Sequence, residues 1–244
     1  MSLESQIADL VSAANKLTAT FSGKKTEIDQ AVARAIAASP ELSRIWYVDQ
    51  IIGDDKAGKG TRAEPFSSIR KCIDSTPKCG RCEVRLLSDY EMRENVTLGG
   101  DLYILGQDAS RKLSTSFFKW GETESSMYGF YVRSINMLSF DTLELSFPES
   151  NLLSPPLTVA AGLLGFVRAS GWNYLGISVR IRNSSIIAPS TFGGALLSAY
   201  VGAFTLMCDT TVFPDDFGGK YIFGVAAGTL PVNLSNVLTN LKKL

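Results

Sequence analysis

The chain has 244 residues and no histidine, and this absence excludes much chemistry. Histidine is the usual general base beside a nucleophilic serine or cysteine, and it is the commonest side-chain metal ligand. The chain also has no net charge at pH 7. It therefore lacks a long-range electrostatic attraction to nucleic acid or to an anionic membrane. We predict a protein without a catalytic centre, cofactor, metal or nucleic-acid partner.

Cysteine is scarce, and an obvious export signal is absent. Glu4 and Asp9 interrupt the place where the apolar core of a signal peptide would lie. We therefore expect synthesis in a cytoplasm, where the four cysteines stay reduced. Cys79 and Cys82 form a C-x-x-C pair, and Cys72 lies nearby. Such a pair resembles half of a zinc site. Structural zinc needs four ligands and Cys208 is distant, so we favour packing of these thiols around a helix.

One uncharged stretch, between Arg182 and Asp209, is long enough for a membrane-spanning helix. Polar and helix-breaking residues such as Pro189, Gly193 and Gly194 divide it into short pieces. We predict buried strands here and no membrane span.

What the sequence does contain first is a regular apolar stripe. From Leu3 onward the spacing alternates between four and three residues, and only Lys24 interrupts the apolar character. The members are Leu3, Ile7, Leu10, Ala14, Leu17, Phe21, Lys24, Ile28, Ala31, Ala35 and Ala38. An average spacing of about 3.5 keeps one seam facing a partner helix, which predicts a left-handed coiled coil over residues 1–39. At ~1.5 Å per residue this would be a rod of roughly 55 Å.

So thin a stripe cannot stabilise a lone helix, so the seam predicts an oligomer. Gly23 in mid-helix weakens the helix by about 1 kcal/mol. A helix lying on the surface of another protein is the alternative. The seam does not fix the number of strands, although the bulk of Phe21 suits three chains better than two.

The remainder is predicted to be rich in β-strands. Three stretches alternate apolar and polar residues with period two, around Val84, Leu145 and Val179. Turn-forming residues separate such stretches, and no long helical period interrupts residues 81–230. The pattern predicts an all-β body, as a sandwich, barrel or solenoid. Residues 231–244 have amphipathic spacing that predicts a short terminal helix.

The segment 40–80 carries an ordered motif. Its members are Trp46, Tyr47, Asp49, Gly53, Asp55, Gly60, Thr61, Pro65, Phe66 and Ile69. This order resembles the first segment of right-handed parallel β-helix proteins, in which a short amphipathic helix covers the open end of the solenoid. The resemblance implies that residues 40–80 form a linker and cap for a parallel β-helix.

The N-terminal helical segment together with this cap is similar to bacteriophage tail fibres and tailspikes. The fold class implied is mainly β with an N-terminal α-helical coiled coil: a trimeric fibre with a short, parallel β-helix-like body. The resemblance further implies a homotrimer in the virion tail, made in the host cytoplasm. Its N-terminus would join other tail or baseplate proteins, and its body would meet host surface polysaccharide or lipopolysaccharide.

Two other functions are alternatives to a non-enzymatic fibre. A tailspike would cleave host polysaccharide with a carboxylate pair. The candidate pairs are Glu122 with Glu124, and Asp215 with Asp216. A cellular β-helix adhesin is the other alternative, and it would require export.

Four residues are candidates for receptor binding. Trp172 and Tyr174 could stack on sugar rings, and Arg180 and Arg182 share the polar face of one strand. Paired arginines suit phosphate or carboxylate groups. The alternative is structural, with Trp172 in the core and the arginines paired with neighbouring acids.

Overall fold

The computed structural model describes residues 2–38, 42–133, 136–169, 176–199 and 202–244. The chain divides into two compact units, residues 1–41 and residues 42–244. Each unit is described by itself.

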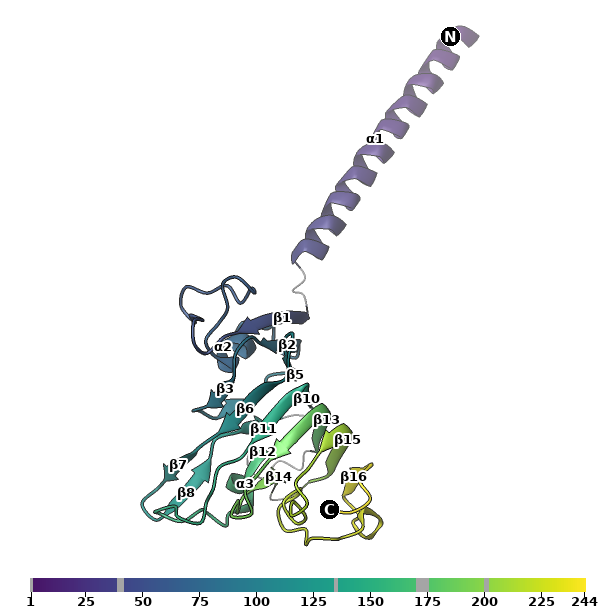
Figure 1. Ribbon diagram of the computed structural model, residues 1–244. Helices are drawn as coiled ribbons and strands as arrows, with labels where there is room; N and C mark the ends of the chain where they lie inside the picture. Colours follow the sequence, from purple (N-terminus) through teal and green to yellow (C-terminus); the bar gives the residue numbers. More distant parts are fainter. Residues whose placement is uncertain (1, 39–41, 134–135, 170–175, 200–201) are drawn as a thin grey trace. The chain divides into compact units, whose positions relative to one another are not determined.

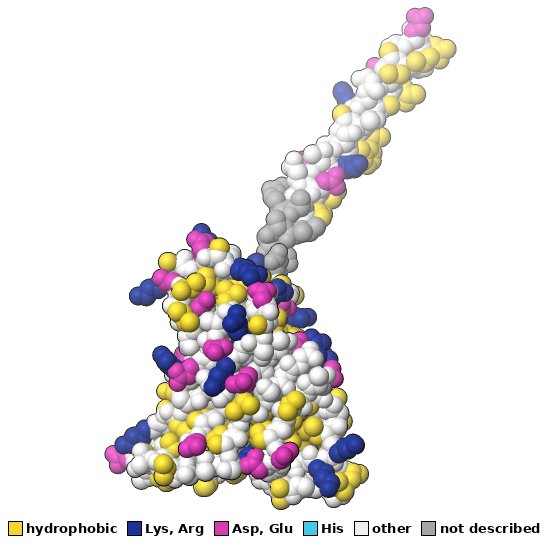
Figure 2. Space-filling view, in the orientation of Figure 1, with side chains coloured by type: hydrophobic (Ala, Val, Ile, Leu, Met, Phe, Trp, Pro, Cys, Tyr) yellow, Lys and Arg dark blue, Asp and Glu magenta, His cyan; other side chains and the backbone are white. Residues whose placement is uncertain are grey.

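The first unit is the single helix α1 (Leu3–Ala38). Ser2 caps its N-terminus, since the Ser5 amide donates to the Ser2 hydroxyl oxygen at 3.3 Å. Glu4 in the first turn complements the positive end of the helix dipole. Lys24 and Glu27 form an ion pair at 2.7 Å along the helix surface. Figure 2 shows apolar side chains along the described surface of this helix.

The second unit is built on a large sheet in which all pairings are parallel. Its main path runs through eight strands, and two further strands extend it from β13. The path is β1 (Ser43–Val48), β2 (Arg81–Leu86), β5 (Asp101–Gly106), β10 (Met137–Asp141), β13 (Ile177–Ile187), β11 (Leu143–Ser146), β6 (Arg111–Thr115) and β3 (Tyr90–Met92). The strands β15 (Phe204–Val212) and β16 (Val237–Thr239) complete it. Figure 1 shows that this sheet is curled.

Two smaller sheets accompany the large one. The four-stranded sheet is also parallel, and it contains β14 (Ala195–Ser198), β12 (Gly165–Ala169), β9 (Phe130–Val132) and β4 (Val96–Thr97). The antiparallel hairpin contains β7 (Phe117–Trp120) and β8 (Glu124–Met127). The short helices are α2 (Ile69–Asp74), α3 (Ala161–Leu164) and the 3-10 turn η1 (Pro231–Asn233).

The core lies between the large sheet and the four-stranded sheet. Phe140 of β10 lies 5.8 Å from Phe130 of β9 and 5.9 Å from Phe166 of β12, measured between ring centroids. The alternating residues predicted to be buried are in this core: Val84 and Val179 are almost fully buried, as is Leu145. Period-two alternation therefore identified these strands correctly, because one face of each packs inward.

The predicted fold class is wrong. The structure is an α/β protein with one N-terminal helix and a mostly parallel, curled sheet like a half-barrel. It is neither a parallel β-helix nor a coiled-coil fibre. The physical reason is that alternation identifies a strand and its buried face, but it specifies neither the strand's neighbours nor the closure of the sheet.

Two further sequence predictions have different outcomes: the predicted C-terminal helix is wrong, and the predicted buried strands after Arg182 are confirmed. Residues 231–244 contain η1 and the strand β16 instead of the predicted helix. The uncharged stretch after Arg182 contains the end of β13, then β14 and the start of β15. Among the described residues, no helix has the length and apolar character needed to cross a membrane.

Candidate interaction surfaces

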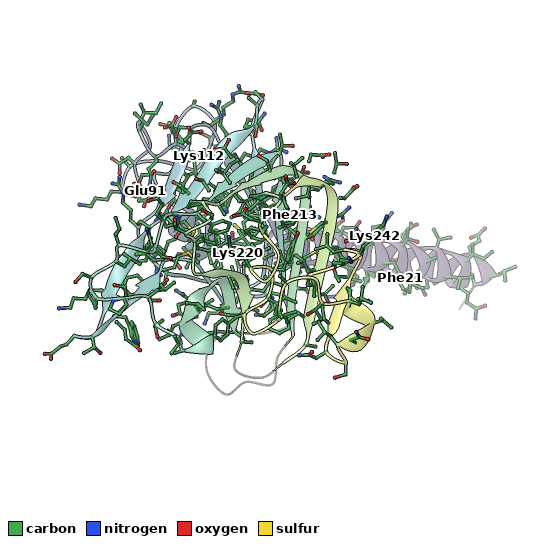
Figure 3. All side chains as sticks on the ribbon, turned by 60° about the horizontal axis from the view of Figure 1, so that its bottom comes forward. Phe21, Glu91, Lys112, Phe213, Lys220 and Lys242 are labelled. Atoms are coloured by element: carbon green, nitrogen blue, oxygen red, sulfur yellow. The ribbon has the colours of Figure 1, made fainter. Side chains whose placement is uncertain are left out.

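The first candidate surface is the helix seam, which we define as the stripe of residues from Leu3 to Ala31 on α1. All its described apolar members are exposed: Leu3, Ile7, Leu10, Ala14, Leu17, Phe21, Ile28 and Ala31. Phe21, labelled in Figure 3, is 66% exposed. Ala35 and Ala38 lie within the helix, but their side chains are outside the described part of the structure.

This exposure is energetically unfavourable for an isolated chain. Each large aliphatic or aromatic side chain gains roughly 1.5–3 kcal/mol when it moves from water into a packed environment. A helix is also only marginally stable without such packing. The helix seam is therefore a surface that gains stability when another apolar surface covers it.

The second candidate surface is the outer face of the large sheet, where the predicted residues Arg180 and Arg182 lie. In-register parallel pairing places Arg182 between Asp141 of β10 and Asp209 of β15. Arg182 Nε donates to Asp141 Oδ2 at 3.0 Å, and a second guanidinium nitrogen donates to the same oxygen. Asn183 Nδ2 donates to Asp141 Oδ1 at 3.1 Å. Arg182 is therefore paired with a neighbouring acid, which was the structural alternative to receptor binding in the sequence analysis.

These contacts set the ionisation of Asp141. Partial burial opposes ionisation, but the hydrogen bonds from Arg182 and Asn183 outweigh it and hold the carboxyl pKa below its usual value. The same hydrogen bond raises the pKa of Arg182. Both groups stay charged near neutral pH.

Arg180 has different neighbours, although it is only two residues away. The same register places it between Ser139 and Met207, so no carboxylate flanks it. Its side chain is exposed, and it forms no ion pair or hydrogen bond with any residue that the structure describes. Within the described part of the chain, Arg180 is thus an unpaired cation, whereas Arg182 two residues away is paired.

A groove of about 350 Å³ opens beside Arg180. Its walls come from three adjacent strands and the turn after β16. The lining includes Met137, Ser178, Arg180, Thr205, Met207 and Asp209. The groove therefore combines the guanidinium of Arg180, the carboxylate of Asp209, two thioether side chains and two hydroxyl groups.

The sequence analysis named two further candidates for receptor binding. Trp172 and Tyr174 lie outside the residues that the structure describes. Sequence reasoning also missed Met137 and Met207, which are about two-fifths exposed. The signal that could have found them is their place on the polar-facing positions of β10 and β15.

The motif of segment 40–80 forms a structural loop before α2. The ring centroids of Trp46 and Phe66 lie 5.4 Å apart. Asp49 Oδ1 accepts a hydrogen bond from the Ile51 amide at 2.9 Å. Asp55 Oδ1 accepts from the Ser67 amide at 2.8 Å, next to the Ser68 N-cap of α2. The other motif residues occupy the same strand, loop and helix start: Tyr47, Gly53, Gly60, Thr61, Pro65 and Ile69. These residues therefore stabilise the loop and the helix.

The proposed carboxylate pairs occupy peripheral positions. Glu122 is exposed in the β7–β8 turn, and Glu124 accepts a hydrogen bond from Thr158 Oγ1 at 2.8 Å. Asp215 is exposed, and Asp216 lies 3.8 Å from Lys220 Nζ. Neither pair lines the groove beside Arg180.

The cysteines do not form a metal cluster among the described residues. Cys72 and Cys82 are buried in the core around α2, and burial raises the pKa of both thiols, that of Cys82 to about 11. Cys79 is exposed. Cys208 is buried in β15, where burial raises its pKa to about 12. Protonated, buried thiols pack as small apolar groups.

Comparison of the chain with protein families, with curated proteins and with solved structures finds no match.

Proposed function

We propose that this protein is a structural and receptor-binding component of a bacteriophage tail, and that it acts without turnover. Copies associate through the helix seam, with three as the expected number. The helical end joins other tail proteins, and the β-rich unit meets polysaccharide or lipopolysaccharide on the host surface.

One observation carries the proposal: the helix seam is apolar and exposed over most of α1. Such an exposed apolar stripe is unfavourable in water and promotes association with another apolar surface. Identical chains provide identical stripes, so self-association is the simplest way to cover it. The likeness of the N-terminal helical sequence to the helical segments of phage tail fibres supports the assignment to a virion.

The structure of the second unit is consistent with a binding role. Its outer sheet face presents fixed side chains in rows, because neighbouring strands pair in register. Rigid strands hold a binding surface more precisely than loops do. The groove beside Arg180 lies on this face.

The test is the mass of the full chain in solution, measured by light scattering. Leu10→Lys combined with Leu17→Lys places two charges in the helix seam. Ser12→Lys combined with Ala19→Lys places the same charges on the opposite face of α1 and serves as the matched control. We expect the unmodified chain and the control to have three times the mass of one chain, and the seam variant to be a monomer.

A monomeric unmodified chain would contradict the proposal, because the helix seam would then need no partner of its own kind. Equal masses for the seam variant and the control would contradict it as well. Circular dichroism of the β-rich unit checks that each variant is folded.

A further inference from the structure

The outer face of the large sheet contains two arginines in different electrostatic surroundings. Arg182 has a carboxylate on each side, Asp141 and Asp209. Asp141 accepts directly from Arg182, and Asp209 adds a favourable charge interaction. Arg180 has neither kind of partner among the described residues.

The charges near the groove limit the ligand. Arg180 and Arg182 supply two positive charges, and Asp141 and Asp209 supply two negative charges, so the patch is balanced. A dianion would be repelled by Asp209, which lines the groove itself. A ligand with a single negative charge is repelled less by Asp209 and can still pair with the guanidinium of Arg180. A carboxylate suits this pairing, because its two oxygens can accept two parallel hydrogen bonds from the planar guanidinium.

The rest of the groove fits a molecule with one apolar face and several hydroxyl groups. Met137 and Met207 are 39% and 40% exposed and form apolar walls. Flexible thioether side chains adapt to irregular ligand surfaces. Ser178 and Thr205 add hydroxyl groups, which can both donate and accept.

The walls of the groove are held in place by neighbouring strands. The Tyr103 hydroxyl donates to Met137 Sδ at 3.7 Å, and the Arg81 guanidinium lies 3.9 Å from the Tyr103 ring centroid. On the other side, Asn240 Oδ1 accepts from the Cys208 amide at 2.9 Å. The Asn240 amide also donates back to the Cys208 carbonyl, so the side chain extends the sheet beside β15. The groove is therefore formed before any ligand arrives.

We propose that this groove binds one carboxylate-bearing sugar residue of a surface polysaccharide, with the carboxylate on Arg180. The apolar face of the sugar ring lies against Met137 and Met207, and its hydroxyl groups bond to Ser178 and Thr205. This inference rests on the proposed receptor-binding function and names its ligand class and site.

The test is isothermal titration calorimetry of the full chain at low salt. The probe is a tetrasaccharide of three galactose residues and one galacturonate residue, which carries a single carboxylate, and the neutral comparison is the galactose tetrasaccharide. We expect binding of the acidic probe and at least about tenfold weaker binding of the neutral one, which is the usual worth of a charge-assisted hydrogen bond. Galactose 6-phosphate tests the dianion and should bind more weakly than galacturonate.

Variants locate the site. Arg180→Gln should weaken binding of the acidic probe by about tenfold or more. Arg180→Lys retains the charge but loses the planar guanidinium, so its affinity for the acidic probe should lie between that of the unmodified chain and that of Arg180→Gln. Arg93→Gln removes an exposed arginine that pairs with Glu91 outside the groove, and it should bind like the unmodified chain.

Several results would overturn the inference. These are no binding of the acidic probe, equal affinity for both tetrasaccharides, tighter binding of the phosphate sugar, or unchanged affinity in Arg180→Gln. The mass of each sample is measured alongside. A chain that self-associates but fails these binding tests would refute the groove assignment alone, whereas a monomeric chain would refute the proposed function.

Discussion

Asp141 of β10 accepts two hydrogen bonds from the guanidinium of Arg182, on the neighbouring parallel strand β13. The Asp141 side chain is 21% exposed, and that of Arg182 is 44% exposed. This pair lies in the same layer of the sheet surface as Asp209. It explains why Arg182 is a structural residue while Arg180 is available to a ligand.

The first prediction concerns Asp141 and pH. Its folded-state pKa is lower than the value of about 3.9 expected in the unfolded chain. The stabilisation is therefore present above the unfolded pKa and is lost as pH falls through the folded pKa. Asp141→Asn should lower the free energy of unfolding by about 1 kcal/mol at pH 7. Urea unfolding should show that this difference shrinks near or below about pH 3.

The control for this prediction is Glu144→Gln. Glu144 lies 4.0 Å from Lys112 Nζ in an exposed pair, so the change should cost less than about 0.5 kcal/mol. A deficit in Asp141→Asn that is the same at both pH values would show that packing, and not charge, stabilises this position.

The second prediction concerns Arg168, which is fully buried in β12. Its guanidinium donates to the Leu163 carbonyl at 2.8 Å and to Asn95 Oδ1, and it lies 4.4 Å from the Tyr131 ring centroid. Burial lowers its pKa. Arg168→Met removes these charge-assisted hydrogen bonds, and the acceptors keep only a neutral donor each: Ser126 Oγ for the Leu163 carbonyl at 2.9 Å and the Gly129 amide for Asn95 Oδ1 at 3.2 Å. We expect a loss of about 3 kcal/mol in the free energy of unfolding.

Denaturant unfolding measures this loss, with Arg93→Met as the control at a side chain that is 73% exposed. The control should change stability by less than about 0.5 kcal/mol. If both variants unfold at the same denaturant concentration, the buried hydrogen bonds of Arg168 contribute no net stability.

The third prediction concerns thiol reactivity. Cys79 is exposed, whereas Cys72, Cys82 and Cys208 are buried with raised pKa values. Because the thiolate is the reactive form, one thiol per chain should react rapidly with a maleimide in the native protein. All four should react in urea, as counted by mass spectrometry. Cys79→Ser should abolish the rapid reaction, and its persistence would mean that a buried thiol is accessible.

The fourth prediction concerns Gly23 in α1. A Cβ atom added there meets no atom within 4 Å. Gly23→Ala should therefore stabilise the helix by about 1 kcal/mol through its higher helix propensity. Thermal melting followed by circular dichroism at the helix band should show a higher midpoint for the helical component.

Gly129→Ala is the contrasting variant, because its added Cβ would lie 2.1 Å from the Phe166 carbonyl oxygen. It should destabilise the β-rich unit by about 2–3 kcal/mol through overpacking. A lower helix midpoint in Gly23→Ala would indicate that the glycine is required for packing against a partner.

The candidate site was predictable only in part. Arg180 was identified from alternation, because it occupies a polar-facing position of β13. The sequence did not show that Arg182 is ion-paired and Arg180 is not, since the two arginines differ only in the residues of the neighbouring strands. Met137 lies in β10, whose pairing with β13 forms the groove wall, and this pairing joins segments about forty residues apart.

The sequence by itself determined the helix from Leu3 to Ala38 and the buried face of strands such as β2 and β13. These properties follow from local periodicity, which each segment carries independently of its neighbours. Only the tertiary structure decided the parallel strand order, the curled sheet and the different surroundings of Arg180 and Arg182. Strand order and register depend on contacts between distant segments, and the period-two pattern is compatible with many pairings.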